Sequence, residues 1–173
     1  MGSRNEDLVP AIPTPIIDRL EAVLRALDAR GQRIILAESC TAGMVASTIT
    51  AVDKLGHVLE CGFVVYSDEA KARLLGVPRS VLADQGAVSE EVARRMAEAA
   101  LGSAGGDVAI AITGFAGPAG SCDEEGLVHF ALARPGHPTE HREEHFGARG
   151  TAGVRLAALG TVIDLLEASG VGP

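Results

Sequence analysis

The sequence has 173 residues, of which 47% are hydrophobic and 3% aromatic, with 21 glycines and a formal net charge of −8 from 15 basic and 23 acidic residues. This length suits a single domain whose core is built from Ala, Val, Leu and Ile, and the acidic balance, without a basic stripe carrying interleaved aromatic residues, argues against nucleic acid as a partner. No stretch approaches the ~18 apolar residues that a membrane span needs, and the start of the chain lacks the basic and apolar regions of a signal peptide, so we expect a cytoplasmic protein.

The beginning of the chain divides into a tail and a helix. Residues 1–13 carry charges and lead into closely spaced prolines, which predicts a mobile tail before one domain over residues 14–170. Residues 16–29 place leucines and valines at helical spacing, with charged residues on the other faces. This pattern predicts a surface helix that packs on a sheet.

The next stretch, residues 33–44, has the pattern of a buried strand, a tight turn and the start of a helix. An apolar run rich in branched residues stops at Glu38-Ser39-Cys40-Thr41-Ala42, and Gly43 precedes a helical pattern over residues 44–52. Such a turn lies beside the free backbone amides of a helix N-terminus, which stabilise anions and developing oxyanions. Ser39 is therefore a candidate nucleophile, with the alternative that Ser39 or Thr41 merely caps the helix.

A second strand-to-helix junction follows. Residues 58–66 form a predicted strand that ends in Tyr66, and Ser67 is a candidate cap for a short helix that ends at Gly76. Lys71 lies one turn into this helix. Tyr66 and Lys71 are thus placed at a junction of the same kind as Ser39.

Further helices and a glycine-rich loop come next. Residues 80–85 form a predicted helical turn, and Ser89 caps a helix that we expect to end near Gly102. Residues 107–113 form a short apolar strand that runs into the loop over residues 114–120. Glycines in such a loop let the backbone approach a phosphate or ribose, although the loop matches neither a Walker loop nor a dinucleotide fingerprint.

The chain ends with a hairpin and a helix. Residues 127–133 and 141–146 form a predicted antiparallel pair, and we expect His141 and His145, on an edge strand, to face solvent rather than to hold a metal. Residues 150–169 form an apolar helix whose start is bracketed by Arg149 and Arg155. These arginines are either anion ligands near a helix N-terminus or ordinary surface charges.

The cysteines and the order of elements complete this description. Cys40, Cys61 and Cys122 lack metal-binding spacing, and their odd number argues against a disulfide framework, so we expect free thiols and no metal. The alternation of strands and helices, with two strands in succession near the end, predicts an α/β fold: a single-domain, three-layer α/β/α sandwich with a mixed sheet.

Several of these segments together resemble a known family. The sequence is similar to the CinA C-terminal domain family, the nicotinamide-nucleotide amidases, over residues 16–168. The resemblance is carried by Ala37-Glu38-Ser39-Cys40-Thr41-Ala42-Gly43, Tyr66-Ser67-Asp68-Glu69-Ala70-Lys71, Gly76-Val77, Gly86-Ala87-Val88-Ser89, Thr113-Gly114-Phe115-Ala116-Gly117-Pro118 and Val154-Arg155.

The resemblance implies a metal-free and cofactor-free serine–lysine amidohydrolase that converts nicotinamide mononucleotide into nicotinate mononucleotide and ammonia. Ser39 would be the nucleophile, Lys71 the general base, and Tyr66 the residue that orients or relays to Ser39. A desolvated lysine with a depressed pKa can take the proton of a serine hydroxyl where no Ser/His/Asp arrangement is present. The substrate-binding residues would be Cys40, Thr41, Ala42 and Gly43 around the oxyanion, with Thr113, Gly114, Ala116, Gly117 and Arg149 around ribose and phosphate.

The sequence also departs from the family pattern. After Gly117-Pro118, members usually show a double glycine and a Lys-Pro-Val-Gly stretch, whereas residues 119–126 here are shorter, lack that lysine and contain Asp123, Glu124 and Glu125. Acids near a phosphate site would repel the phosphate. Members also usually carry glycine at the position of Ala42 and aspartate at the position of Ala148.

Three alternatives stay open. The same serine–lysine pair could act on another small amide, the domain could be a non-catalytic nucleotide-binding or partner-binding module, or Cys40 could replace Ser39 as the nucleophile, since a thiol at a helix N-terminus has a lowered pKa. Alanine-rich helices permit a homo-oligomer, which we expect without a specified size.

Overall fold

A five-stranded mixed sheet forms the middle layer of the computed structural model, which describes residues 11–118, 120 and 123–170. The strands are β1 (Ile34–Glu38), β2 (Leu59–Val64), β3 (Val108–Gly114), β4 (Leu127–Ala133) and β5 (Glu140–His145), in the order β2-β1-β3-β4-β5. β1 runs parallel to both of its neighbours, whereas β3, β4 and β5 alternate in direction. The carboxyl ends of the three parallel strands therefore meet at one edge of the sheet, where ligands bind in open α/β sheets.

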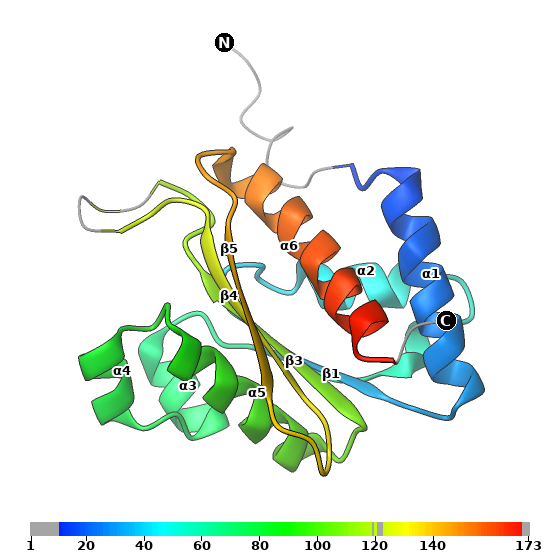
Figure 1. Ribbon diagram of the computed structural model, residues 1–173, viewed down its shortest axis with the longest axis horizontal. Helices are drawn as coiled ribbons and strands as arrows, with labels where there is room; N and C mark the ends of the chain where they lie inside the picture. The colour runs from blue at the N-terminus through cyan, green and yellow to red at the C-terminus, as the bar shows by residue number, and fades with distance from the viewer. Residues whose placement is uncertain (1–10, 119, 121–122, 171–173) are drawn as a thin grey trace.

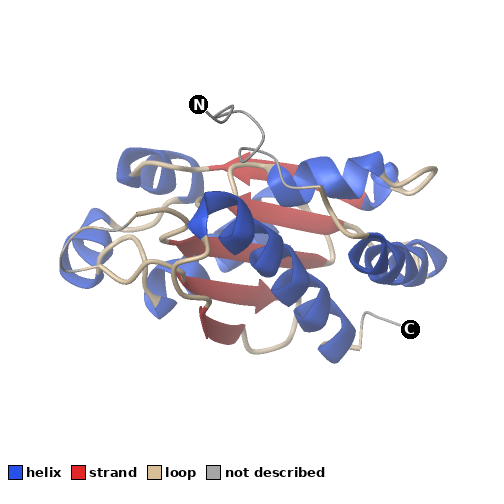
Figure 2. Ribbon diagram, turned by 90° about the horizontal axis from the view of Figure 1, so that it is seen from above, coloured by secondary structure: helices blue, strands red, loops and turns tan. Residues whose placement is uncertain are grey.

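Helices cover both faces of this sheet (Figures 1 and 2). One face carries α1 (Thr14–Ala29), α2 (Met44–Ala51) and α6 (Gly150–Ala168), and the other carries α3 (Asp68–Leu75), α4 (Arg79–Gln85) and α5 (Glu90–Ala104). A short 3-10 turn, Gly56–Val58, leads into β2. The predicted three-layer α/β/α sandwich with a mixed sheet is confirmed.

The two faces of the sheet have different side chains. Ile34 and Leu36 of β1 and Ile110 and Ile112 of β3 point into the core under α1, α2 and α6. The alternate positions of these strands contribute Ile35 and otherwise alanines to the core on the other face. Five alanines of β1, β3 and β4 lie in one cluster with three alanines of α5: Ala37, Ala109, Ala111, Ala131 and Ala133 with Ala93, Ala97 and Ala100. Short side chains on both partners let α5 lie close to the sheet at interior packing density, which explains how a chain with few aromatics fills its core.

Local signals placed most element boundaries correctly. Ser67 and Ser89 cap α3 and α5 as predicted, since their hydroxyls accept hydrogen bonds from the amides of Ala70 and Val92. α5 runs past Gly102 to Ala104, because Gly105, with a φ of 69°, supplies the left-handed cap that ends it. Of the predicted tail, residues 1–10 lie outside the described residues, and Ile12 packs against the core. In the described part of the chain, none of the helices is long and apolar enough to cross a membrane.

A glycine contact fixes the loop between β3 and β4 against the start of α6. The amide of Gly126 donates to the carbonyl of Phe115 at 2.8 Å, and the carbonyl of Gly126 accepts from Phe146 at 2.9 Å. Gly126 has a φ of 88°, and a Cβ atom there would collide with the backbone of Gly147. This close approach positions the loop that forms one wall of the site described below.

We expect Gly126→Ala to lower the free energy of unfolding far more than Gly136→Ala. Gly136 also has a positive φ, of 73°, but has open space around it. The control Gly136→Ala should cost about 1 kcal/mol for the left-handed backbone alone, and Gly126→Ala should exceed ~2 kcal/mol because the backbone of Gly147 must also move. Urea unfolding of the two variants measures the difference, and equal losses would contradict the close approach.

Candidate active site

The turn between β1 and α2 reverses the chain within five residues. The amide of Ser39 donates to the carbonyl of Ile112 at 2.9 Å, which ties the turn to the end of β3, and the amide of Ala42 donates to the carbonyl of Ser39 at 3.1 Å. Ala42 and Gly43 both have left-handed backbones, with φ values of 53° and 87°. An alanine at φ 53° is uncommon, because its Cβ atom crowds the following carbonyl oxygen.

The first amides of α2 are occupied, contrary to the sequence-based expectation. The carboxylate of Glu38 accepts hydrogen bonds from the amides of Gly43 at 3.0 Å, Val45 at 3.2 Å and Ala46 at 2.8 Å. The expectation of free helix N-terminal amides was wrong because a glutamate side chain reaches back from the end of the strand. The alternative in which Ser39 or Thr41 caps α2 is wrong as well, since the N-cap is Gly43, without a side-chain cap bond.

Ser39 and Lys71 meet in the interior. The Nζ atom of Lys71 donates to the Oγ atom of Ser39 at 3.1 Å and to the carbonyl oxygen of Tyr66 at 3.2 Å. Ser39 is 6% exposed and Lys71 only 1%. The cap at Ser67 starts α3 so that Lys71, one turn later, faces the sheet.

Burial changes the chemistry of Lys71. Removing the ammonium from water lowers the pKa of Lys71 below its ordinary value of 10.5, and the nearby carboxylate of Asp68 opposes this only in part. Within the described residues, no carboxylate lies within ion-pair distance of the Nζ atom. The amine is therefore neutral at a lower pH than an ordinary lysine, and a neutral amine can accept the proton of the Ser39 hydroxyl.

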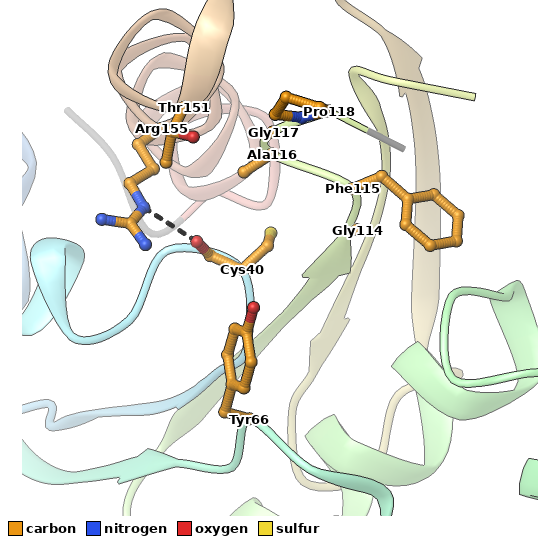
Figure 3. A pocket seen from close by; sticks show the side chains of 9 residues that line it. All are labelled: Cys40, Tyr66, Gly114, Phe115, Ala116, Gly117, Pro118, Thr151 and Arg155. Carbon is orange, nitrogen blue, oxygen red and sulfur yellow. Dashed lines mark hydrogen bonds between the residues drawn. The ribbon is translucent and has the colours of Figure 1, made fainter. Parts of the chain in front are cut away.

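Tyr66 contacts the pair through its backbone. Its carbonyl oxygen holds Lys71, whereas its ring is 74% exposed. In Figure 3 the phenol points toward the turn at Cys40 from the side of the cavity opposite to Pro118. No hydrogen bond joins the phenol oxygen to the residues that the structure describes, so the contact of Tyr66 with Lys71 is made by the carbonyl alone.

A cavity of about 320 Å³ opens beside the pair (Figure 3). It lies between the β1–α2 turn, Tyr66, the loop after β3 and the first two turns of α6. Neither Ser39 nor Lys71 lines it, but their neighbours Cys40 and Tyr66 do. The lining residues are Cys40, Tyr66, Gly114, Phe115, Ala116, Gly117, Pro118, Thr151 and Arg155.

Four of the predicted substrate-binding residues line this cavity: Cys40, Gly114, Ala116 and Gly117. The others do not. Thr113 is buried and its hydroxyl donates to the carbonyl of Ala87 at 2.7 Å, on the other side of the sheet. Thr41 is fully buried, and the amide of Gly43 is bonded to Glu38. Ala42 belongs to the turn but not to the lining, and Arg149 is exposed at the N-cap of α6.

Arg155, and not Arg149, is the basic residue at the cavity. Its Nε atom donates to the carbonyl of Cys40 at 2.9 Å, which fixes the guanidinium against the β1–α2 turn. Thr151 and Arg155 are four residues apart and therefore share one face of α6. The sequence could predict from this spacing that Thr151 and Arg155 share a face of α6, but it does not say which face of the helix points to the cavity.

The thiol of Cys40 is a poor candidate nucleophile. Burial raises the pKa of Cys40 to about 12, because desolvation penalises the thiolate. The helix N-terminus that would lower this pKa has its amides bonded to Glu38. The thiol is therefore protonated near neutral pH, and this geometry favours Ser39.

The acidic segment does not line this cavity but borders a neighbouring one, and Phe115 lines both. Asp123 and Glu124 line a different cavity of about 530 Å³, on the side of residues 85–88. The carboxylate of Glu124 contacts the Nδ1 atom of His145 at 2.7 Å. The contact with His145 offsets part of the negative charge of Glu124 and so reduces the repulsion expected between this acid and a phosphate. Ala119, Ser121 and Cys122 lie outside the described residues.

The histidines differ from the expectation. His145 is exposed, but the side chain of His141 is only 12% exposed, because α5 covers it, and its Nε2 atom lies 3.0 Å from the Nδ1 atom of His129. Burial lowers the pKa of both His129 and His141. No group of three or more metal-ligating side chains with suitable geometry occurs among the described residues.

Comparison with known proteins identifies the family to which the sequence is similar. Residues 18–169 match the family described as CinA C-terminal domain. A CinA-like protein of Anaeromyxobacter sp. (strain K) is 50% identical over 117 residues, 66% of this chain, and one of Synechococcus sp. (strain RCC307) is 42% identical over 148 residues, 84% of this chain. The chain spans only 29% and 35% of the length of these two relatives.

Solved structures cover the whole fold. The competence/damage inducible protein CihA from Agrobacterium tumefaciens superposes with a TM-score of 0.87 at 33% identity, over 92% of this chain and 98% of that one. The competence damage-inducible protein A (ComA) from Klebsiella pneumoniae superposes with a TM-score of 0.83 at 36% identity, over 88% of this chain and 95% of that one.

The left-handed backbone at Ala42 leads to a stability prediction. We expect Ala42→Gly to raise the free energy of unfolding by about 0.5–1 kcal/mol, since relief of a left-handed Cβ exceeds the entropy cost of glycine. Ala22→Gly, at an exposed position in the middle of α1, should instead lower it by about 0.5–1 kcal/mol. Urea unfolding measures both, and a loss of stability in Ala42→Gly would contradict the strain.

Proposed function

This chain belongs to the CinA C-terminal domain family, and from this premise we propose that it is an amidohydrolase that converts nicotinamide mononucleotide into nicotinate mononucleotide and ammonia. The observation that carries the proposal is the 3.1 Å contact between Lys71 and Ser39, both buried beside a cavity. A buried lysine without a carboxylate partner lowers the stability of the fold. Its place next to a serine hydroxyl, from which it can take a proton, gives a functional reason for keeping it there.

The proposed reaction has two halves. The neutral amine of Lys71 takes the proton of Ser39 as the Oγ atom attacks the carboxamide carbon, and a tetrahedral oxyanion forms. The Lys71 ammonium then gives that proton to the leaving nitrogen, ammonia departs, and an ester remains on Ser39. A water molecule then gives a proton to Lys71 and attacks the ester. As the bond between the acyl carbon and the Ser39 Oγ atom breaks, the Lys71 ammonium returns that proton to Ser39, and the acid product leaves and loses its own proton to solvent.

The cavity suits an anionic nucleotide. Arg155 supplies a positive charge at the cavity, and Gly114 and Gly117 leave its wall without side chains. Tyr66 holds Lys71 by its carbonyl and presents its ring to the same space. Since the acids of residues 123–125 do not line this cavity, they give no reason to prefer a neutral amide over the nucleotide.

A binding role without catalysis is the second candidate. It is favoured by one observation: the chain spans about a third of the CinA-like relatives it matches, so in those proteins the domain accompanies other segments. This role would need binding of the nucleotide without release of ammonia.

We expect Ser39→Ala and Lys71→Met each to reduce ammonia release from nicotinamide mononucleotide by at least ~10³-fold, because removing one member of a nucleophile–base pair removes its joint effect. Ser47→Ala and Lys54→Met are matched controls, since Ser47 is an exposed serine of α2 and Lys54 is the other lysine of the chain, 87% exposed. Ammonia release is measured beside urea unfolding, and near-normal turnover in either pair variant would overturn the mechanism.

The buried base predicts the pH dependence. A general base works only when unprotonated, so kcat/KM should rise with pH through the lowered pKa of Lys71 and level off below the ordinary lysine value of 10.5. Lys71→Arg, which stays protonated, should be inactive at every pH. A rate that falls across the same range would show that the protonated lysine is the active form and contradict the proposal.

Alkylation separates the two nucleophiles. Because Ser39 and not Cys40 carries the reaction here, Cys40→Ala should keep turnover within about tenfold of wild type, whereas a thiol nucleophile would lose ~10³-fold or more. The measurement is ammonia release by wild type and by Cys40→Ala, each before and after treatment with iodoacetamide. A loss as large as that of Ser39→Ala would identify Cys40 as the nucleophile.

A further inference from the structure

We propose that Glu38 is a positioning residue, which holds the β1–α2 turn so that Ser39 and the backbone amide of Cys40 are set for catalysis. The inference rests on the proposed serine–lysine chemistry, and it concerns a residue that supports the site without touching the substrate. It begins from a buried carboxylate, 1% exposed, that is bonded only to backbone amides.

The two residues lie on opposite faces of the sheet. Successive side chains of a strand alternate between faces, and Glu38 continues the series of Ile34 and Leu36, which face α2. Ser39 follows Ile35 and Ala37 toward the side of α3 and Lys71. Glu38 therefore cannot take the proton of Ser39, and its influence on the reaction passes through the backbone of the turn.

The carboxylate fixes that backbone at three points. One oxygen accepts from the amides of Gly43 and Val45 and the other from Ala46, so both oxygens are used. The turn they hold contains two successive left-handed residues, Ala42 and Gly43, one of which is disfavoured in that conformation. Charge-assisted bonds from a buried carboxylate are strong enough to keep such a turn in a single geometry.

The same bonds determine which amides remain for an oxyanion. Between residues 39 and 47, the amide of Ser39 is bonded to Ile112, that of Ala42 to Ser39, that of Met44 to Thr41 and that of Ser47 to Gly43. Glu38 takes those of Gly43, Val45 and Ala46. Within the described part of the chain, only the amides of Cys40 and Thr41 in this segment donate to no backbone or carboxylate oxygen. Thr41 is fully buried, whereas Cys40 lines the cavity and directly follows the nucleophile, so the amide of Cys40 is the one placed for an oxyanion.

The test is the variant Glu38→Gln. A glutamine can keep the bonds of one oxygen, but its NH₂ group then faces the third amide, donor against donor. The turn would then shift, and its free backbone amide would bond less well to the oxyanion, which develops only in the transition state. We therefore expect kcat for ammonia release from nicotinamide mononucleotide to fall roughly 10- to 100-fold, with KM nearly unchanged.

Thr48→Val is the matched control. Thr48 is buried in α2 and its hydroxyl donates to the carbonyl of Met44 at 2.7 Å, so its loss weakens the same helix without touching the turn. Both variants should unfold at a lower urea concentration than wild type, and only Glu38→Gln should lose kcat. Equal kcat in the two variants, or a Glu38→Gln value within twofold of wild type, would overturn the inference.

A second measurement does not depend on the substrate. Phenylmethylsulfonyl fluoride reacts with an activated serine: the Ser39 oxygen bonds to sulfur, fluoride leaves, and Lys71 takes the hydroxyl proton. We expect intact-mass spectrometry to find labelling of wild type and Thr48→Val at similar rates and of Glu38→Gln at least tenfold more slowly. Labelling of wild type without ammonia release would reject the nucleotide substrate while this ratio still decides the role of Glu38. A wild type that is neither labelled nor active would overturn both proposals.

Discussion

The buried amine of Lys71 is the group on which the arrangement of the site depends. Placing an ammonium in the interior without a carboxylate costs several kcal/mol, and the protein reduces this cost by lowering the pKa of Lys71 and by offering two oxygen acceptors, from Ser39 and Tyr66. The remaining free-energy cost is offset by the stability of the fold, which has a packed core on each side of the sheet. A single-sided core would leave Lys71 at a solvent boundary, where it would stay charged.

The pleat of β1 protects this low pKa. Glu38 is one residue from Ser39, and a carboxylate on the same face would pair with Lys71 and keep it protonated. Alternation sends Glu38 to the α2 face, where backbone amides satisfy it instead. Glu38 and Lys71 thus lie on opposite faces of the sheet, and the carboxylate of Glu38 does not pair with the amine of Lys71. A shift of one residue in the register of β1 would turn Glu38 toward Lys71 and Ser39 toward α2. Ser39 would then lose its contact with Lys71, and the turn would lose its bonds to Glu38.

Local patterns in the sequence were sufficient for the fold and placed Ser39 and Lys71 at strand-to-helix junctions, but the pairing of the two came from the family resemblance, and the walls of the site were not predicted. The caps at Ser67 and Ser89 and the apolar runs of β1 and β3 are decided within a few residues, so they could be predicted. Glu38 was missed because capping rules look at the residues next to a helix start, and this carboxylate reaches it from the preceding strand. Arg155 and His141 were misjudged because their surroundings depend on how α6 and α5 pack, which no local pattern contains.

Charge is distributed so that an acidic protein can still present a cavity suited to an anion. The chain carries a net charge of −8, yet the cavity beside Ser39 is lined by one arginine and by no acid. Asp123 and Glu124, in the segment that departs most from the family pattern, face a separate cavity, and Glu124 is paired with His145 on β5. Arg155 is thus the one charged side chain in the described lining of the cavity beside Ser39. Because no acid in that lining competes with it, an anion that enters the cavity would depend on Arg155 for its electrostatic attraction.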